Sequence, residues 1–492
     1  MNATQPAEAV DIQGLLWSGF GSLPEAAFLL VRIDNPPAAR VWLHTAGVTT
    51  IADLANPQAT VLQIALSANG LRRLGVPDRI RDAFAPEFLD GMAGDAARSR
   101  RLGDVGASAP ENWRWGYPSE PDALLLLYAQ AGGLETFKRD IGAAVRQAGF
   151  TVVHELPTSD MGSKEPFGFK DGVSQPRIDW EGRRTPNSSD DLEYGNLISV
   201  GEFVLGYRNE YGLYTERPVL AESGALPDAE DRHGSRDLGR NGSYLVLREL
   251  HQDVRGFWRF VAEQAGISGA EALAEAMVGR HRSGEPLVAR HHLPIRGVGP
   301  GQADIEANQF IYDADRAGVG CPVGAHVRRA NPRTGDLPGG RQGLVARLLR
   351  TLGVPRPDLR SDLIASSRFH RIVRRGREFG SWVDPRTAMQ PDCPEPASGL
   401  HFICLNANIS RQFEFIQNAW LNSAKFNGLG DESDPLTGNR MPLQSGQPTD
   451  RFSLPQANGV ARRLQSIPPF VTVRGGGYFF LPGVRALRFL TQ

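Results

Sequence analysis

Short apolar runs of strand type alternate with helix-period segments along this chain, and this order constrains the fold more than any other feature. In the first third, a helix-period segment, 134–148, lies between two strand-like runs, 123–129 and 150–156. Two further strand-like runs, 26–33 and 60–66, precede it. Strand, helix and strand at this spacing indicate an α+β unit in which helices pack on one face of a sheet.

The same order returns in the second half of the chain. The segments there are, in order, strand 243–250, helix 251–264, strand 400–405, helix 411–421, and strands 470–473 and 478–481 around three glycines. No close internal sequence repeat accompanies this second set. The pattern therefore predicts a second α+β unit that shares the architecture of the first.

Length and composition set the expected domain boundaries. At about 100–200 residues per domain, 492 residues allow two to four domains. Residues 1–16 lack periodicity and are expected to form a loose N-terminal arm. Segment 17–220 is expected to form the first domain and 221–492 the second, with an insertion near 334–367.

Charge and cysteine content narrow the classes of partner and compartment. The formal net charge is −1, so no global field favours nucleic acid or an anionic membrane. Three cysteines are too few for a disulfide framework and fit a reducing compartment. No secretory signal pattern and no apolar run of about 18 residues is visible. We therefore expect a cytoplasmic protein without nucleic-acid or membrane partners.

A long segment, 158–196, is rich in Gly, Pro and Asp, and a loop of this length is usually functional. It contains Gly168-Phe169-Lys170-Asp171-Gly172. A carboxylate with a pKa near the reference value of about 3.9 is ionised at neutral pH and can accept a proton. Gly168 and Gly172 permit unusual backbone dihedrals and close approach to a flat ligand. Taken alone, the pentapeptide is more typical of a simple Asp-Gly turn.

Two later segments carry further candidates. His326 ends the run Cys321-Pro322-Val323-Gly324-Ala325-His326, in which two small residues precede a potential metal ligand. The run Arg374-Arg375-Gly376-Arg377-Glu378-Phe379-Gly380 offers a guanidinium that stays protonated at any working pH. Arg375 is the adjacent alternative to Arg374. Without further context, each segment is also compatible with an ordinary histidine or a solvated basic strand.

In this order, the three segments closely resemble the dye-decolorizing (DyP-type) haem peroxidases. The resemblance includes the longer stretch from Phe167 to Pro176 and covers the chain from about residue 20 to its end. It implies that Asp171 carries the proton, that Arg374 supplies a fixed positive charge, and that His326 binds the iron. Arg377 and Glu378 depart from the family, which usually has an apolar residue and Pro there.

The resemblance also implies the remaining site residues. Arg328 and Arg333 would bind the haem propionates, with Arg329 as a rival. Asp434 would accept a hydrogen bond from the His326 ring, with Asp431 as the alternative. Leu400 and Phe402 would be an apolar pair beside the haem, and Gly168 and Gly172 would contact the cofactor.

The fold and activity implied by the resemblance are specific. The expected fold is α+β, with two ferredoxin-like domains of the dimeric α+β barrel type and the haem held mainly by the C-terminal half. One haem b per chain is expected, bound non-covalently because no Cys-x-x-Cys-His sequence is present. The expected reaction reduces hydrogen peroxide to water through a ferryl intermediate and oxidises a bulky phenolic or dye-like electron donor.

Three alternatives remain at this point. The protein could use haem to oxidise one specific metabolite, or could bind haem with little turnover. It could also be a ferredoxin-like binding module without a cofactor, because a fold does not fix a function. The sequence leaves open whether the protein forms an oligomer.

Overall fold

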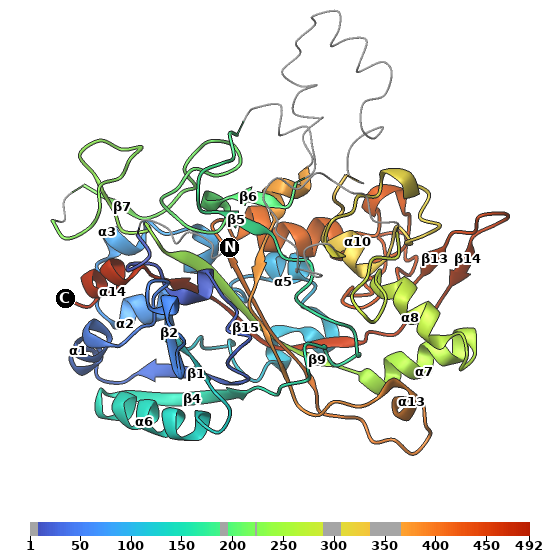
Figure 1. The fold of residues 1–492 in the computed structure, drawn as a ribbon, viewed down its shortest axis with the longest axis horizontal. Helices are drawn as coiled ribbons and strands as arrows, with labels where there is room; N and C mark the ends of the chain where they lie inside the picture. Colours follow the sequence, from blue (N-terminus) through green and yellow to red (C-terminus); the bar gives the residue numbers. More distant parts are fainter. Residues whose placement is uncertain (1–7, 187–194, 222–223, 289–306, 335–365) are drawn as a thin grey trace, which may run out of the picture.

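A nine-stranded antiparallel sheet forms the centre of the protein (Figure 1). The computed structural model describes residues 8–186, 195–221, 224–288, 307–334 and 366–492. The strand order is β10-β12-β9-β15-β2-β3-β1-β4, and β11 also pairs with β12. Apolar clusters cover both faces of this sheet, and each cluster draws on strands from both halves of the chain.

The N-terminal half of the sheet has the order β4-β1-β3-β2. Its elements are β1 (Glu25–Ile33), α1 (Pro36–Thr45), β2 (Thr60–Leu66), β3 (Ala123–Ala129), α6 (Leu134–Gln147) and β4 (Phe150–Pro157). This β-α-β-β-α-β succession is the ferredoxin-like unit. The strands form where the sequence has its apolar runs, and β3 is buried along its whole length.

The C-terminal half repeats the arrangement. Its main elements are β9 (Ser243–Gln252), α7 (Val254–Ala265), β10 (Val373–Arg374), β11 (Arg377–Phe379), β12 (Gly399–Asn406), a π-helical segment (η9, Ser410–Glu414, and η10, Ile416–Leu421) and β15 (Val471–Leu481). Pairing of Phe480 with Leu66 joins β15 to β2, so the two half-sheets are continuous. The predicted α+β fold with two ferredoxin-like units is confirmed.

Shorter elements surround the sheet. The helices are α2 (Ala68–Arg73), α3 (Asp78–Arg81), α4 (Pro86–Asp90), α5 (Ala96–Leu102), α8 (Ala270–Val278), α10 (His326–Ala330), α13 (Pro385–Ala388) and α14 (Val484–Leu490). The strands are β5 (Arg177–Asp179), β6 (Leu197–Ser199), β7 (Val219–Leu220), β8 (Arg236–Asp237), β13 (Phe452–Leu454) and β14 (Arg462–Leu464).

The end of the sheet differs from expectation. Residues 470–481 were expected to form two strands, but Val471–Leu481 is a single strand whose register shifts between Val473 and Gly475. A Cβ atom on Gly475 would lie 2.3 Å from the indole nitrogen of Trp115. The glycine run therefore lets β15 pass close to an aromatic ring without ending the strand.

The start of the chain also differs from expectation. Residues 9–16 do not form a loose arm, because Ile12, Leu15 and Leu16 are fully buried. The Gln13 side chain donates hydrogen bonds to the carbonyl oxygens of Ile64 (2.8 Å) and Pro482 (2.9 Å). The arm prediction is therefore wrong for this stretch, while residues 1–7 lie outside the described residues.

The predicted domain boundary near residue 220 stays a prediction. Helix α14, at the end of the chain, packs against α1 of the first half (Figure 1). Nearly all of the expected insertion at 334–367 lies outside the described residues.

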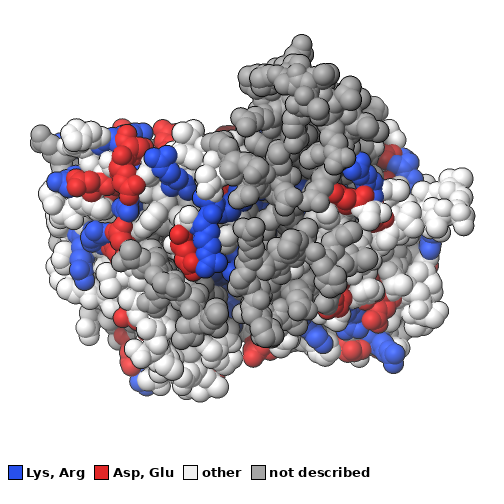
Figure 2. All heavy atoms as spheres, turned by 45° about the horizontal axis from the view of Figure 1, so that its top comes forward, with Lys and Arg blue, Asp and Glu red and all other residues white. Residues whose placement is uncertain are grey.

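The surface and the helices give two further observations. Among the helices of the described ranges, none combines the length and the apolar character needed to cross a membrane. Figure 2 shows Lys and Arg lying next to Asp and Glu on the visible face. Both signs of charge are therefore mixed there, in line with the net charge of −1.

Candidate active site

A cavity of about 690 Å³ lies against one face of the C-terminal half of the sheet. Alternate residues of the strands line it, including Leu250 of β9 and the pair Leu400 and Phe402 of β12. Because side chains two apart on a strand share a face, this is the arrangement that the sequence predicted for the pair. The volume lies within the range of about 300–1,000 Å³ that is typical of ligand and cofactor sites.

His326 forms one wall of the cavity. It begins α10, and its Nδ1 donates a hydrogen bond to the Asp434 carboxylate at 3.0 Å. Asp434 is fully buried and also accepts hydrogen bonds from the backbone N–H groups of Leu436 and Thr437. The contact fixes the ring, so Nε2 lies on the ring edge away from Asp434.

The alternative partner, Asp431, is engaged elsewhere. Its carboxylate pairs with Arg451 and Arg463 and accepts a hydrogen bond from Gln447 at 2.9 Å. Of the two acidic residues that the sequence suggested, the structure therefore places Asp434 against His326.

The His326–Asp434 pair is electrostatically coupled. Burial raises the pKa of Asp434, but the His326 charge, its hydrogen bond and Arg329 outweigh this and hold that pKa far below its usual value. Burial lowers the pKa of His326, but the Asp434 charge and hydrogen bond outweigh burial and raise it. An anionic partner thus makes the imidazole a more basic ligand.

Asp171 and Arg374 lie together in the same cavity. Arg374 Nη1 donates a hydrogen bond to Asp171 Oδ1 at 2.7 Å, and the side chains of Arg374 and Asp171 keep 27% and 34% of their surface accessible. Both residues line the cavity, so this surface is available to a bound molecule. Burial raises the pKa of Asp171, but the charge and hydrogen bond of Arg374 outweigh it and lower that pKa. The result is an ionised carboxylate beside a fixed cation.

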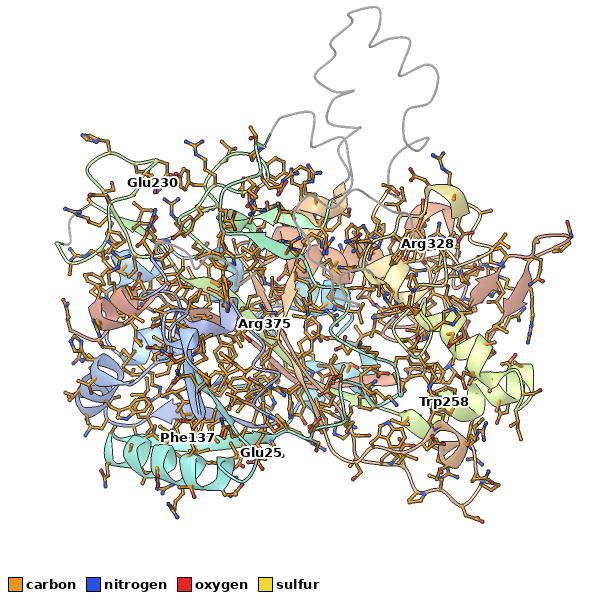
Figure 3. All side chains as sticks on the ribbon, viewed as in Figure 1. Glu25, Phe137, Glu230, Trp258, Arg328 and Arg375 are labelled. Atoms are coloured by element: carbon orange, nitrogen blue, oxygen red, sulfur yellow. The ribbon has the colours of Figure 1, made fainter. Side chains whose placement is uncertain are left out.

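Arg375 points away from this site. Its guanidinium donates to the carbonyl oxygens of Leu15 (2.7 Å) and Leu16 (3.2 Å) in the N-terminal half (Figure 3). The glycine that follows, Gly376, lies between β10 and β11, where a Cβ atom would be 2.5 Å from the carbonyl oxygen of His401. The geometry therefore selects Arg374 over Arg375.

The two glycines beside Asp171 shape the loop. Gly168 and Gly172 have φ values of +94° and +80°, which L side chains rarely adopt. Neither lines the cavity. The structure gives them a role in the backbone conformation that places Asp171, and their contact with the cofactor stays a prediction.

The arginines that were expected to bind the propionates make hydrogen bonds to backbone carbonyl oxygens. Arg328 donates to the carbonyl oxygens of Cys321 (2.6 Å) and Asp315 (2.9 Å) and lies over the Tyr312 ring (Figure 3). Arg333 donates to the carbonyl oxygens of Asn308 and Phe310.

The rival Arg329 is also committed to the backbone, since it donates to the carbonyl oxygens of Gly324 (3.1 Å) and Trp420 (2.8 Å). Arg328, Arg329 and Arg333 are all buried, and none lines the cavity. These arginines therefore stabilise the loops around His326, and their contact with the propionates stays a prediction.

Other cations line the cavity instead, and the sequence interpretation missed them. They are Lys170, Arg248, Arg280, Arg371 and Arg440. Arg280 donates to Ser174 Oγ at 2.9 Å, and Arg440 donates to the carbonyl oxygens of Asp434 and Pro435. Arginine suits carboxylate ligands such as propionates. The one available signal was the basic run 371–377, which contains Arg371.

These residues fit a haem. Among the residues that the structure describes, no cluster of three or more His, Cys, Asp or Glu side chains could hold a bare metal ion. A metal bound by His326 would thus need a group that brings its own further ligands, as a porphyrin does. Apolar side chains for a macrocycle and cations for its propionates line the same cavity.

Replacing Asp434 by Asn tests whether Asp434 holds His326 in place as the haem ligand. We expect the affinity for haem to fall by about 10-fold to 100-fold, because partners of metal-bound histidines have effects of this size. Haem titration followed by the Soret band measures the change. Asp431→Asn is the matched control and should keep the wild-type affinity; equal affinities in both variants would contradict the assignment.

Comparison with known proteins finds relatives that are named as dye-decolorizing peroxidases. No family model matches the chain. The multifunctional dye peroxidase of an Amycolatopsis species is 30% identical over 495 residues, which cover 97% of this chain and 92% of that protein. A dye-decolorizing peroxidase of Auricularia auricula-judae is 27% identical, over 97% of this chain and 86% of that protein.

Solved structures agree in fold. The DyP-type peroxidase of Auricularia auricula-judae superposes with a TM-score of 0.72 at 24% identity, and the match covers 100% of both chains. A dye-decolorizing peroxidase in complex with 2,6-dimethoxyphenol gives 0.71 at 22% identity, over 98% of this chain and 99% of that chain. The length and identity of the Amycolatopsis match show that this chain belongs to the dye-decolorizing peroxidase family, as the order of its three motifs predicted.

Proposed function

We propose that this peroxidase binds one haem b per chain, without covalent attachment, through His326. It reduces hydrogen peroxide to water and oxidises bulky phenolic or dye-like donors. One observation carries the proposal: a single cavity is lined both by His326, which is held from behind by Asp434, and by the Asp171–Arg374 pair. A peroxidase needs these three functions together, namely a donating ligand, a proton carrier and a fixed positive charge.

When bound, the haem supplies the redox chemistry, because it takes two oxidising equivalents from peroxide and passes them to donors. The protein supplies the proton transfer. Asp171, ionised beside Arg374, accepts the proton of one peroxide oxygen and returns it to the other, which leaves as water. Arg374 stabilises the negative charge that develops on the leaving oxygen.

The nature of the donor is supported by relatives. One solved dye-decolorizing peroxidase is described in complex with 2,6-dimethoxyphenol, and the Amycolatopsis relative is named a multifunctional dye peroxidase. We propose donors of the same class here. A cytoplasmic location also remains a proposal, and it is supported by three cysteines that are all free and buried.

Two measurements on the purified protein test the proposal. An absorption spectrum with a Soret band and extraction of the pigment identify the haem and its attachment. Peroxide-dependent oxidation of 2,6-dimethoxyphenol and of a synthetic dye then measures turnover. A Soret band without turnover would favour a haem-binding protein or an enzyme for one metabolite, and no Soret band would favour a binding module without cofactor.

Asp171 should give the reaction an acid optimum. Because Arg374 lowers the pKa of Asp171, the carboxylate stays ionised in acid, and its proton exchange is most efficient near its own pKa. We expect the fastest turnover toward the lower end of about pH 3–5, because the pKa of Asp171 lies below the reference value for aspartate of about 3.9. Asp171→Asn should remove this optimum and most of the rate.

The measurement is the steady-state rate between pH 3 and 8, a range chosen to span roughly the pKa values of aspartate and histidine. Asp160→Asn is the matched control, since Asp160 belongs to the same segment but is exposed and accepts a hydrogen bond from Gly162. An Asp171→Asn variant with the wild-type rate and pH profile would exclude Asp171 as the proton carrier.

A further inference from the structure

A second carboxylate, Glu165, lines the cavity shortly before Asp171 in the chain, and the peroxide chemistry leaves it without a role. Glu165 Oε1 accepts a hydrogen bond from the backbone N–H of Phe169 at 2.9 Å. Glu165 Oε2 accepts one from the backbone N–H of Phe167 at 3.0 Å and one from Gln252 Nε2 at 2.7 Å. Both oxygens are thus used to hold the loop that leads to Asp171.

The backbone of this loop closes on itself. Glu165 N–H donates to the carbonyl oxygen of Phe169 at 2.9 Å, and Gly168 N–H donates to that of Glu165 at 2.8 Å. Further along, Asp171 N–H donates to the carbonyl oxygen of Ser163 at 3.0 Å. The segment 163–171 is therefore a closed loop with the Glu165 carboxylate inside it and Asp171 at its end.

The outer side of the loop is anchored in the core. Phe167 and Phe169 are buried, and Phe169 stacks on Trp258. The indole of Trp258, on α7 (Figure 3), donates to the carbonyl oxygen of Phe167 at 3.0 Å. Aromatic packing thus fixes the outer side of the loop, and the Glu165 carboxylate fixes its inner side.

We propose that Glu165 is a positioning residue for the peroxide reaction: it holds the loop so that Asp171 stays within hydrogen-bond distance of Arg374. The proposal rests on the proposed function of Asp171 as proton carrier. Buried N–H groups need acceptors, and a carboxyl group offers one on each oxygen in either protonation state. A glutamine offers only one oxygen, and its NH₂ group would face an N–H donor.

The groups around Glu165 shift its pKa in both directions. Burial raises its pKa to about 7, the amide hydrogen bonds oppose this rise, and the charge of Asp171 adds to it. Lys164, Lys170 and Asp171 belong to the loop, Arg282 donates a hydrogen bond to the carbonyl oxygen of Gly168, and the charges of Glu165 and His326 interact across the cavity. Because both carboxyl oxygens can accept in either state, the loop contacts persist at acid pH.

The test uses the haem-loaded protein and four forms: wild type, Glu165→Gln, Asp171→Asn and the double variant. Hydrogen exchange of segment 163–173 reports on the loop itself. The rate of the peroxide-dependent change in the haem spectrum reports on the reaction. We expect exchange in Glu165→Gln to be about 10-fold faster or more, because a buried backbone N–H group would lose its acceptor.

The rate should also fall in Glu165→Gln, and the double variant should react no more slowly than Asp171→Asn alone. A residue that acts through Asp171 has nothing left to position once that carboxylate is gone. Gln252→Leu, which removes only the third hydrogen bond, should give smaller effects in the same direction and serves if Glu165→Gln does not fold.

Glu25→Gln is the matched control. Glu25 (Figure 3) also accepts hydrogen bonds from two backbone N–H groups of one loop, those of Gly132 (2.7 Å) and Leu134 (3.0 Å), but it does not line the cavity. Its replacement should loosen that loop and leave the peroxide reaction unchanged.

Two results would overturn the inference while the proposed function stands. One is wild-type exchange and rate in Glu165→Gln. The other is an equal further loss of rate when Glu165→Gln is added to Asp171→Asn, which would show that Glu165 acts independently of Asp171. A wild-type protein that binds haem but does not react with peroxide would instead overturn the proposed function, and the inference with it.

Discussion

Replacing His326 by Ala is expected to leave the purified protein almost without haem. Nε2 of this residue is the proposed ligand, and its other nitrogen is already bound to Asp434. Loss of a hydrogen-bond partner of a metal-bound histidine lowers affinity by about 10-fold to 100-fold, and loss of the ligand itself should exceed this. The ratio of Soret to protein absorbance after purification, and haem titration of the apoprotein, measure the effect.

His370 provides the control for this experiment. Of the histidines in the described part of the chain, it and His326 are the two that line the cavity. Its Nδ1 donates to the carbonyl oxygen of Arg411 at 2.5 Å, its ring stacks on Phe415, and burial lowers its pKa to about 4. We expect His370→Ala to keep the haem. Retention of haem by His326→Ala together with loss from His370→Ala would move the ligand to His370.

The fold could be predicted where local pattern decides structure. The strands lie within a residue or two of the apolar runs, because a run of seven residues such as 123–129 has the length of a strand that is buried on both faces. The pattern did not show that the two half-sheets join. This join depends on the pairing of Phe480 with Leu66, which lie far apart in the sequence. The pattern also missed the burial of residues 9–16, whose few apolar side chains pack against strands distant in sequence.

The site was predictable where residues sit in continuous motifs. Asp171, His326 and Arg374 all line the cavity, and the structure places Asp434, which the family resemblance suggested, against His326.

The backbone contacts of Arg328, Arg329 and Arg333 could not be predicted, for a physical reason. A long guanidinium side chain reaches carbonyls that its sequence neighbours do not reveal, as Arg328 does at Cys321. Arg280 and Arg440 were missed because separate loops bring them to the cavity.

Replacing Arg374 by Leu is expected to slow the reaction with peroxide about 100-fold to 1,000-fold, the effect of removing one donor from a site that stabilises developing negative charge. This corresponds to about 3–4 kcal/mol of barrier. A leucine still places a side chain at the cavity wall, but it provides no cation for the leaving oxygen. Stopped-flow mixing of the haem-loaded variant with peroxide, followed at the Soret band, gives the second-order rate constant.

The pH dependence should change in the same variant. Without Arg374, burial is the main remaining influence on Asp171, so the pKa of this carboxyl should rise. Asp171 must be ionised to accept the peroxide proton, and the loss of rate in acid should therefore begin at a higher pH than in the wild type. An Arg374→Lys variant, which restores a cation but not the planar fork, should recover part of the rate.

Arg375→Leu separates a catalytic effect from a structural one. The Arg375 guanidinium donates hydrogen bonds to the carbonyl oxygens of Leu15 and Leu16. Its loss leaves these buried acceptors unpaired and should therefore lower the midpoint of thermal unfolding. The rate constant per bound haem should remain close to wild type, since Arg375 does not line the cavity. If Arg375→Leu slowed the peroxide reaction more than Arg374→Leu, the fixed charge would belong to Arg375, and the hydrogen bond between Arg374 and Asp171 would serve structure alone.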